Sequence, residues 1–125
     1  MDFVKTDKAP AAIGPYSQAV ITGNLVFCSG QIPLDPATMQ LVGDNITDQI
    51  KQVLSNITEV VKAAGSVVDK IVKVNLYLKD MNDFATVNEI YGNFFGDHKP
   101  ARAAVEVARL PKDVMIEIEC IAEIA

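Results

Sequence analysis

The chain has 125 residues; half are hydrophobic, 22% are charged, and the formal net charge is −5. This length predicts a single domain over residues 1–125, large enough to bury a core without disulfides or a bound metal. The composition excludes a disordered chain, and no apolar run approaches the roughly 18 residues of a membrane span. The first residues do not have the pattern of a signal peptide, so we expect a soluble, cytoplasmic protein.

Residue counts narrow the chemistry. The single histidine, His98, excludes catalysis that needs two histidines in one chain. Cys28 and Cys120 lie too far apart for a CxxC redox or zinc motif, and we expect them to be reduced and buried. The excess of 16 acidic over 11 basic residues argues against a nucleic-acid partner. No glycine-rich nucleotide motif occurs, which leaves nucleotide cofactors without local support, and a single histidine excludes a His-rich metal site. We therefore expect no cofactor and no metal.

The first elements predicted along the chain are strands. Residues 3–6 form a possible short strand, and a loop containing Pro10 and the Gly14-Pro15 pair follows. Val20–Thr22 and Leu25–Ser29 are two runs of β-forming residues separated by Gly23-Asn24. Since Gly and Asn tolerate positive φ angles, this spacing predicts a tight hairpin.

A long amphipathic helix follows a loop rich in proline. Asn45 is suited to cap its first turn, with Asp48 favourable beside the helix dipole, and Gly65 is suited to end it. Steps of three and four residues predict one buried apolar stripe, made of Ile46, Ile50, Val53, Leu54, Ile57, Val60, Val61 and Ala64.

The second half of the chain alternates between the two periodicities. Residues 70–79, 101–107 and 114–124 have the period-two pattern of strands, while residues 83–95 have that of a second helix. On the first of these strands we expect Val72, Val74, Leu76 and Leu78 to share one face. On the helix we expect Phe84, Val87, Ile90, Tyr91 and Phe94 to point inward.

The predicted order is β-β-β-α-β-α-β-β, which indicates a two-layer α+β domain with a mixed sheet. Two helices can cover only one face of that sheet. The other face is too apolar for a fully wet surface and too charged for a core, which is typical of a surface packed on another subunit. We expect this open face to carry either Leu25, Phe27 and Ser29 or their alternates, together with Tyr77, Arg102, Ala104, Glu117, Glu119 and Ile121.

Arg102 and Glu119 are the first candidates for a functional site. If the apolar residues of both strands face the helices, these two side chains emerge together on the open face. An arginine is suited to hold a carboxylate through two parallel hydrogen bonds, and a glutamate beside it can orient a water or transfer a proton. The alternatives are two ordinary surface charges or an ion pair between strands.

Three further positions have two interpretations each. Tyr16 follows Gly14-Pro15 and either lines a binding site or packs in a turn. The Ser29-Gly30 pair stands at a strand end, where it either meets an anion through the backbone or forms a bulge. His98 is interpreted as a structural or surface residue. The residues by themselves therefore predict an oligomeric α+β protein with a possible carboxylate site.

Three segments resemble those of one known family, RidA (also called YjgF). They are Ile13–Ala19, Cys28–Pro33, and Pro100–Pro111 running into Ile116–Glu119. Val87–Tyr91 also resembles part of the second helix of that family, and the likeness extends over essentially the whole chain. The resemblance implies a chorismate-mutase-like fold assembled as a homotrimer, with helices outside, sheets around the centre and sites between subunits.

The resemblance also implies an activity and roles for single residues. The activity is cofactor-free hydrolysis of 2-aminoacrylate and related enamines or imines to ammonia and 2-keto acids such as pyruvate and 2-ketobutyrate. Arg102 matches the residue that binds the substrate carboxylate, Glu119 the acid near the attacking water, and Tyr16 a tyrosine of the site. Ser29, Gly30 and Asn88 match substrate-binding positions. Where many members have a cysteine, this chain has Ala104, so only the backbone carbonyl there can hold the water.

Two other functions remain open from the sequence. The same cleft can bind 2-keto acids without turnover, as a ligand-binding or chaperone-like protein. The family is also associated with endoribonuclease or translation-inhibitor activity, which the negative charge disfavours. The presence of both an arginine and a glutamate favours catalysis, because capture of a carboxylate needs only the arginine.

Overall fold

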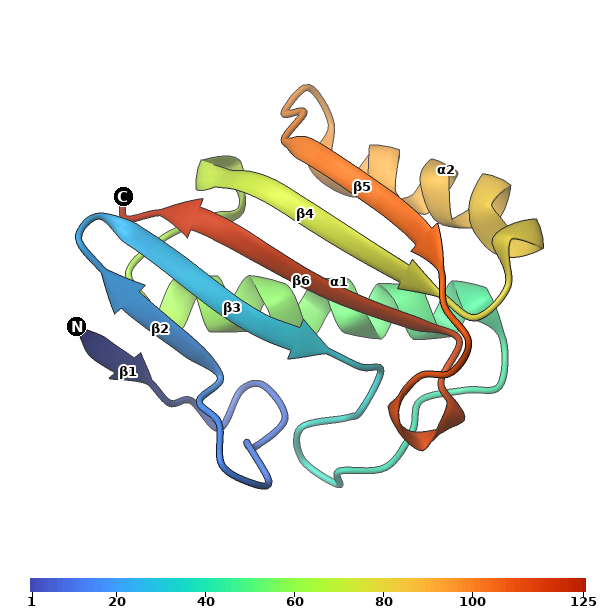
Figure 1. Cartoon of the computed structure of the whole chain (residues 1–125), viewed down its shortest axis with the longest axis horizontal. Helices are drawn as coiled ribbons and strands as arrows, with labels where there is room; N and C mark the ends of the chain where they lie inside the picture. The colour runs from blue at the N-terminus through green and yellow to red at the C-terminus, as the bar shows by residue number, and fades with distance from the viewer.

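The computed structural model describes residues 1–125 and consists of a six-stranded sheet with two helices on one of its faces (Figure 1). The predicted order of strands and helices is confirmed. The elements are β1 Asp2–Val4, β2 Ala19–Thr22, β3 Leu25–Gln31, α1 Ile46–Ala63, β4 Ile71–Leu78, α2 Phe84–Phe95, β5 Ala101–Glu106 and β6 Ile116–Glu123. Neither helix is both long enough and apolar enough to cross a membrane.

The strands lie in the order β1-β2-β3-β6-β4-β5, and only β4 and β5 run parallel. The parallel pair is joined by α2, because a parallel connection needs a crossover element. In Figure 1 both helices lie behind the sheet, with α1 crossing behind its middle and α2 behind the β4–β5 edge. The fold is therefore α+β with two layers, as the sequence predicts.

Local signals set the hairpin and the long helix. Gly23 turns the chain between β2 and β3 with a φ of 58°, a conformation that favours glycine. At the start of α1, the Asn45 side-chain oxygen accepts a hydrogen bond of 2.8 Å from the Asp48 backbone N–H. Gly65, with a φ of 86°, follows the last turn. The predicted cap and stop of this helix are confirmed.

The core lies between the sheet and the helices. The α1 stripe packs there, and Ile50, Val53, Val60 and Val61 are completely buried. Cys28 and Cys120 face each other across β3 and β6, both free and buried, as expected. His98 lies after α2, where its Nε2 lies 2.7 Å from the Ile71 carbonyl oxygen, which agrees with its structural interpretation.

The alternation of buried and exposed residues in β4 differs from the prediction at the start of the strand. A bulge between Ile71 and Lys73 shifts the register against β6, so that Ile71 is buried while Val72 is exposed. Simple alternation places Val72 in the core because it allows for no extra residue in the strand. From Val74 onward the alternation is as predicted.

The orientation of β5 is opposite to the prediction. Arg102 lies opposite Val74 and Ala104 opposite Leu76, and both β4 residues face the helices. Arg102 and Ala104 therefore face the helix layer, and Arg102 does not share the open face with Glu119. The prediction assumes that the apolar residues of an edge strand point inward, whereas here Ala101, Ala103 and Val105 are exposed on the open face.

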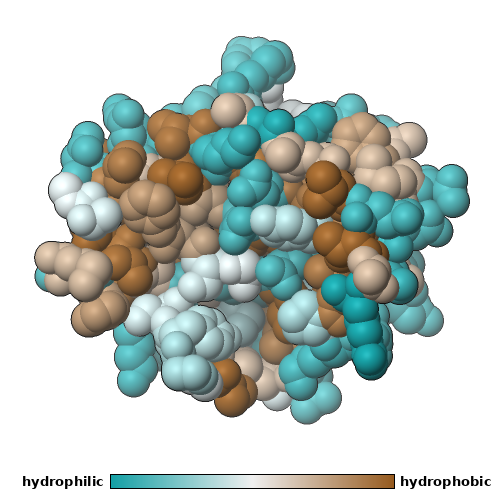
Figure 2. Space-filling model, in the orientation of Figure 1, coloured by the Kyte–Doolittle hydropathy of each residue, from teal (hydrophilic) through white to brown (hydrophobic).

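The open face is hydrophobic in large part, as Figure 2 shows over β1–β3 at the left of the view. Phe3, Val20, Phe27 and Ile121 are register partners in a row across four strands, and Phe3 is 69% exposed. At the opposite edge, Val105 is 46% exposed. This face has the character expected of a surface that packs against another chain.

Candidate functional site

The Arg102 side chain is held by the surface of α2. Its Nη1 donates a hydrogen bond of 2.7 Å to Oδ1 of Asn88, and its guanidinium carbon lies 4.9 Å from the ring centre of Tyr91 and 5.4 Å from that of Phe84. The three α2 residues are spaced four and three positions apart, so they share one side of the helix. We call Phe84, Asn88 and Tyr91 the α2 cradle.

A hollow of about 450 Å³ lies beside this arginine, between α2 and the start of β5. Its lining includes His98 and Lys99 as well as Asn88, Tyr91 and Arg102. Arg102 makes no ion pair, since the only salt bridge of the chain joins Arg109 and Asp113. An exposed guanidinium with no acidic partner at the edge of a hollow is suited to bind an anion.

A second hollow, of about 440 Å³, lies at the other side of the sheet among the loops that flank β2, β3 and β6. Tyr16 and Gly30, both predicted site residues, line it together with Lys112 and Glu117. Glu117 was not predicted as the acidic residue, although it stands in the same Ile116–Glu119 segment. We call this region the Tyr16 pocket.

Gly30 and Glu117 fit one another within the Tyr16 pocket. A methyl group built on Gly30 would overlap the Glu117 carboxylate, so the absence of a side chain at position 30 leaves the space that this carboxylate occupies. Burial raises the pKa of Glu117, and the nearby charge of Glu119 raises it further. A carboxyl with a raised pKa exchanges its proton more readily near neutral pH, as a general acid or base must.

Glu119 lies on the open face but lines a different, smaller hollow of about 210 Å³ together with Lys73 and Asn75. Its Oε1 accepts hydrogen bonds from the Tyr77 hydroxyl at 2.5 Å and from the Asn75 amide at 3.0 Å. The hydrogen bond to Glu119 raises the pKa of Tyr77 to about 12. Both bonds engage the same carboxylate oxygen within its own chain, and Glu119 does not line the Tyr16 pocket.

Ser29, on β3, anchors the loop that precedes β2. Its hydroxyl donates a hydrogen bond of 2.5 Å to the Ser17 carbonyl, and its backbone N–H donates one of 3.0 Å to the Gln18 carbonyl. The buried Gln18 amide in turn donates to the carbonyls of Thr6, Ala9 and Pro10. Both donors of Ser29 are therefore engaged within the chain. Ser29 lies beside the Tyr16 pocket and supports the loop that carries Tyr16.

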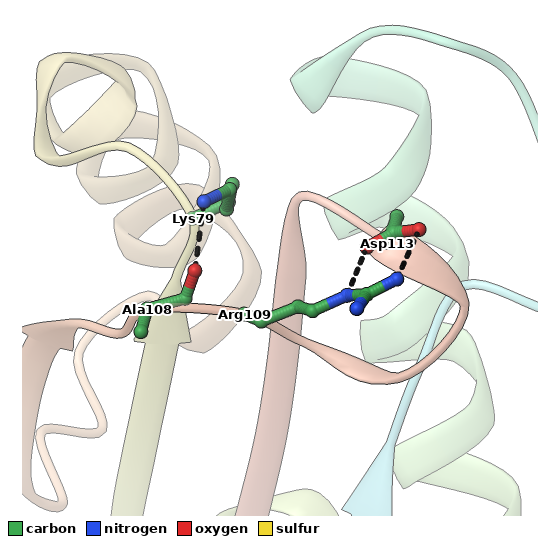
Figure 3. A network of polar contacts seen from close by, with 4 residues as sticks. All are labelled: Lys79, Ala108, Arg109 and Asp113. Atoms are coloured by element: carbon green, nitrogen blue, oxygen red, sulfur yellow. Dashed lines mark hydrogen bonds and ion pairs between the residues drawn. The ribbon is translucent and has the colours of Figure 1, made fainter.

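The loop between β5 and β6 contributes Pro111 and Lys112 to the wall of the Tyr16 pocket. Figure 3 shows its contacts: the Arg109 guanidinium makes two hydrogen bonds to the Asp113 carboxylate, at 2.7 and 3.2 Å, and Lys79 donates to the Ala108 carbonyl. Lys112, which lines the pocket, has a φ of 56°. The ion pair thus spans a backbone segment in a conformation that non-glycine residues rarely adopt.

The predicted site residues therefore fall into separate groups. Arg102 lies with Asn88 on the helix side of the sheet, with Ala104 partly buried next to it. Tyr16 and Gly30 lie together in the Tyr16 pocket, and Glu119 lies apart from both groups. Sequence alternation places Glu117 and Glu119 on one face, but loops surround Glu117 near the start of β6, whereas only residues of β3, β4 and β6 line the hollow at Glu119.

Comparison with known proteins shows the family to which the chain belongs. The family model described as Endoribonuclease L-PSP matches residues 6–124. The chain belongs to this family, RidA or YjgF. A 2-iminobutanoate/2-iminopropanoate deaminase of Salmonella typhimurium is 54% identical and aligns over 95% of this chain and 94% of its own length.

Solved structures of the RidA family have the same fold. The YjgF gene product of Escherichia coli superimposes with a TM-score of 0.94 at 51% identity, over 98% of each chain. Escherichia coli TdcF, solved with bound serine, gives a TM-score of 0.95 at 46% identity and covers 100% of both chains. The α+β subunit fold, a six-stranded mixed sheet with two helices, is thereby shown to be that of the family.

Proposed function

We propose that this protein is a cofactor-free hydrolytic deaminase of 2-aminoacrylate and related enamines and imines. The observation that carries the proposal is Arg102, an exposed arginine without an acidic partner, held at a hollow in a chain 54% identical to a 2-iminobutanoate/2-iminopropanoate deaminase. The serine in the related TdcF structure is likewise a small molecule with a carboxylate. A cytoplasmic location is part of this proposal.

The proposed reaction adds one water to one carbon–nitrogen double bond. An enamine first takes a proton on carbon to become the imine. Water then attacks the imine carbon while its nitrogen is protonated, and the resulting carbinolamine loses ammonia to leave the 2-keto acid, pyruvate or 2-ketobutyrate. The imine carbon is already electrophilic, so holding the substrate and one water in the correct geometry supplies most of the catalysis.

Roles follow from the surroundings of each residue. Arg102 binds the substrate carboxylate, which fixes the position of the adjacent imine carbon. We assign the acid–base role to Glu117 rather than Glu119, because Glu117 lies in the Tyr16 pocket and its pKa is raised. The Tyr16 hydroxyl and the backbone at Gly30 and Ala104 then contact the substrate or its water.

These roles require two chains. Within one chain Arg102 faces the helix layer and Glu117 the open face, with β4 between their strands, so no small substrate touches both. A homotrimer in which the Arg102 hollow of one subunit meets the Tyr16 pocket of the next joins them. The exposed hydrophobic residues of the open face, such as Phe3, Phe27 and Val105, support burial of that face between subunits.

A coupled assay tests the activity. A serine or threonine dehydratase generates the imine, and the release of keto acid is followed with and without this protein. We expect faster release with the wild type and a loss of at least about 100-fold with Arg102→Ala, because positioning of the carboxylate is removed. Absence of acceleration by wild type, or full activity of the variant, would contradict the proposal. Binding of keto acid without acceleration would instead indicate the ligand-binding function.

Mixing two inactive variants tests the shared site. When Arg102→Ala and Glu117→Gln chains are unfolded together and refolded at equal amounts, about one quarter of the sites in a trimer receive both wild-type residues. We therefore expect activity to return to about a quarter of wild type, whereas separately refolded variants stay inactive. Sites contained within one chain would give no recovery.

A further inference from the structure

The α2 cradle holds Arg102 in a way that leaves most of its binding capacity free. Asn88 accepts from Nη1, and this is the only hydrogen bond of the guanidinium within the chain. The guanidinium carbon lies over two rings, closer to that of Tyr91 than to that of Phe84. Because guanidinium and carboxylate are both planar, two parallel hydrogen bonds form only when the plane of the arginine is set correctly.

Tyr91 is an unusual member of this cradle. It is only 7% exposed, and its hydroxyl is the one buried side-chain polar atom in the chain without a hydrogen-bond partner. A buried hydroxyl without a partner is destabilising, so the hydroxyl does not explain the presence of Tyr91. What Tyr91 offers Arg102 is the face of its ring, which attracts a cation and limits its rotation.

We propose that Tyr91 is a positioning residue for Arg102, and that it acts through its ring rather than its hydroxyl. Asn88 fixes one edge of the guanidinium and the Tyr91 ring fixes its plane, so that the free edge faces the hollow that both residues line. This inference rests on the proposed carboxylate binding by Arg102. It also gives Asn88 a role through the arginine, in addition to its predicted place among the substrate-binding residues.

Three substitutions separate the ring from the hydroxyl and from general packing. Tyr91→Phe keeps the ring and removes the unpaired hydroxyl, so we expect 2-ketobutyrate binding within about two-fold of wild type and a higher melting temperature. Tyr91→Leu removes the ring, and we expect binding about ten-fold weaker, with KM raised more than kcat lowered. Tyr91→Met, which retains more volume, replaces the leucine variant if that variant does not fold.

A double-mutant cycle with Arg102→Lys shows whether Tyr91 acts through the arginine. Binding of 2-ketobutyrate is measured by NMR titration, which detects weak binding. If Tyr91 positions the guanidinium, Tyr91→Leu loses its ten-fold effect in the Arg102→Lys background, since lysine is a point charge without a plane to orient. An equal loss in both backgrounds, or a Tyr91→Phe variant as weak as Tyr91→Leu, would overturn the proposal.

A measurement without ligand keeps this test separate from that of the proposed function. In the ¹⁵N spectrum of the arginine side chains, we expect the Arg102 Nη groups to give separate signals in wild type and Tyr91→Phe because their rotation is slow. In Tyr91→Leu these signals should merge. Signals that are averaged in all three proteins would overturn the positioning role. Separate signals without any binding of 2-ketobutyrate would refute the carboxylate site alone.

Discussion

The two halves of the candidate site are built in different ways. The Arg102 half consists of regular elements, with a β5 side chain resting on the α2 cradle. The Tyr16 pocket consists mainly of loops, which Gln18 and the Arg109–Asp113 ion pair hold in place. A helix and a strand hold a binding group rigidly, whereas loops supply varied groups around reacting atoms.

The two halves also differ in the groups that surround their charged side chains. An amide and two aromatic rings surround the Arg102 guanidinium, so its charge remains available to an anion. Glu117 is partly desolvated and has a second carboxylate nearby, which makes its charged form less favourable. The contrast fits the proposed roles of Arg102 in binding the substrate carboxylate and of Glu117 in transferring a proton.

The choice between the two glutamates has the largest expected effect. Glu117→Gln should lower kcat about 100-fold, because it removes the carboxylate of the Tyr16 pocket. Glu119→Gln should lower it less than about ten-fold, since Glu119 is bonded to Asn75 and Tyr77. Steady-state rates in the coupled assay measure both. The reverse order would restore the acid role that the sequence assigns to Glu119.

The fit between Gly30 and Glu117 predicts the next largest effect. Gly30→Ala should lower kcat roughly ten-fold or more, because the added methyl group displaces the Glu117 carboxylate. Adding Glu117→Gln to this variant should cause little further loss, as the two changes remove the same interaction. Fully additive losses would mean that Gly30 acts independently of Glu117.

The loop ion pair predicts a smaller effect, confined to the Tyr16 pocket. Arg109→Ala should raise KM roughly two- to five-fold with kcat nearly unchanged, because both partners are exposed and their ion pair only restricts the loop. Lys51→Ala, an exposed position on α1 that does not line the pocket, serves as a matched loss of one positive charge. If both variants raise KM equally, the effect is one of net charge and not of loop order.

The smallest predicted effect is on stability. A raised pKa means that folding favours the protonated form of Glu117, so its contribution to the free energy of unfolding falls as pH rises from below about 4.5 through the folded-state pKa. Glu117→Gln should therefore melt up to a few degrees higher than wild type at pH 7, with the difference disappearing at pH 4. Thermal unfolding followed by circular dichroism measures this. A lower melting temperature at pH 7 would show that the carboxylate stabilises the fold.

Several features of the fold were predictable because they depend on neighbours in sequence. The cap at Asn45, the apolar stripe of α1 and the turn at Gly23 follow from local backbone preferences and helical periodicity. The bulge at Ile71–Lys73 was not predictable, since alternation counts every residue equally. The bulge becomes visible only in the pairing with β6.

The sequence by itself determined the elements, their order and the residues that resemble the RidA family. Tertiary structure decided which way β5 faces: Arg102 turns to α2, while Val105 is exposed on the open face. It also decided that Glu117, not Glu119, lies with Tyr16 and Gly30. The physical reason is that alternation fixes which residues share a face but not which face is covered, because that depends on the helices and loops packed against the sheet.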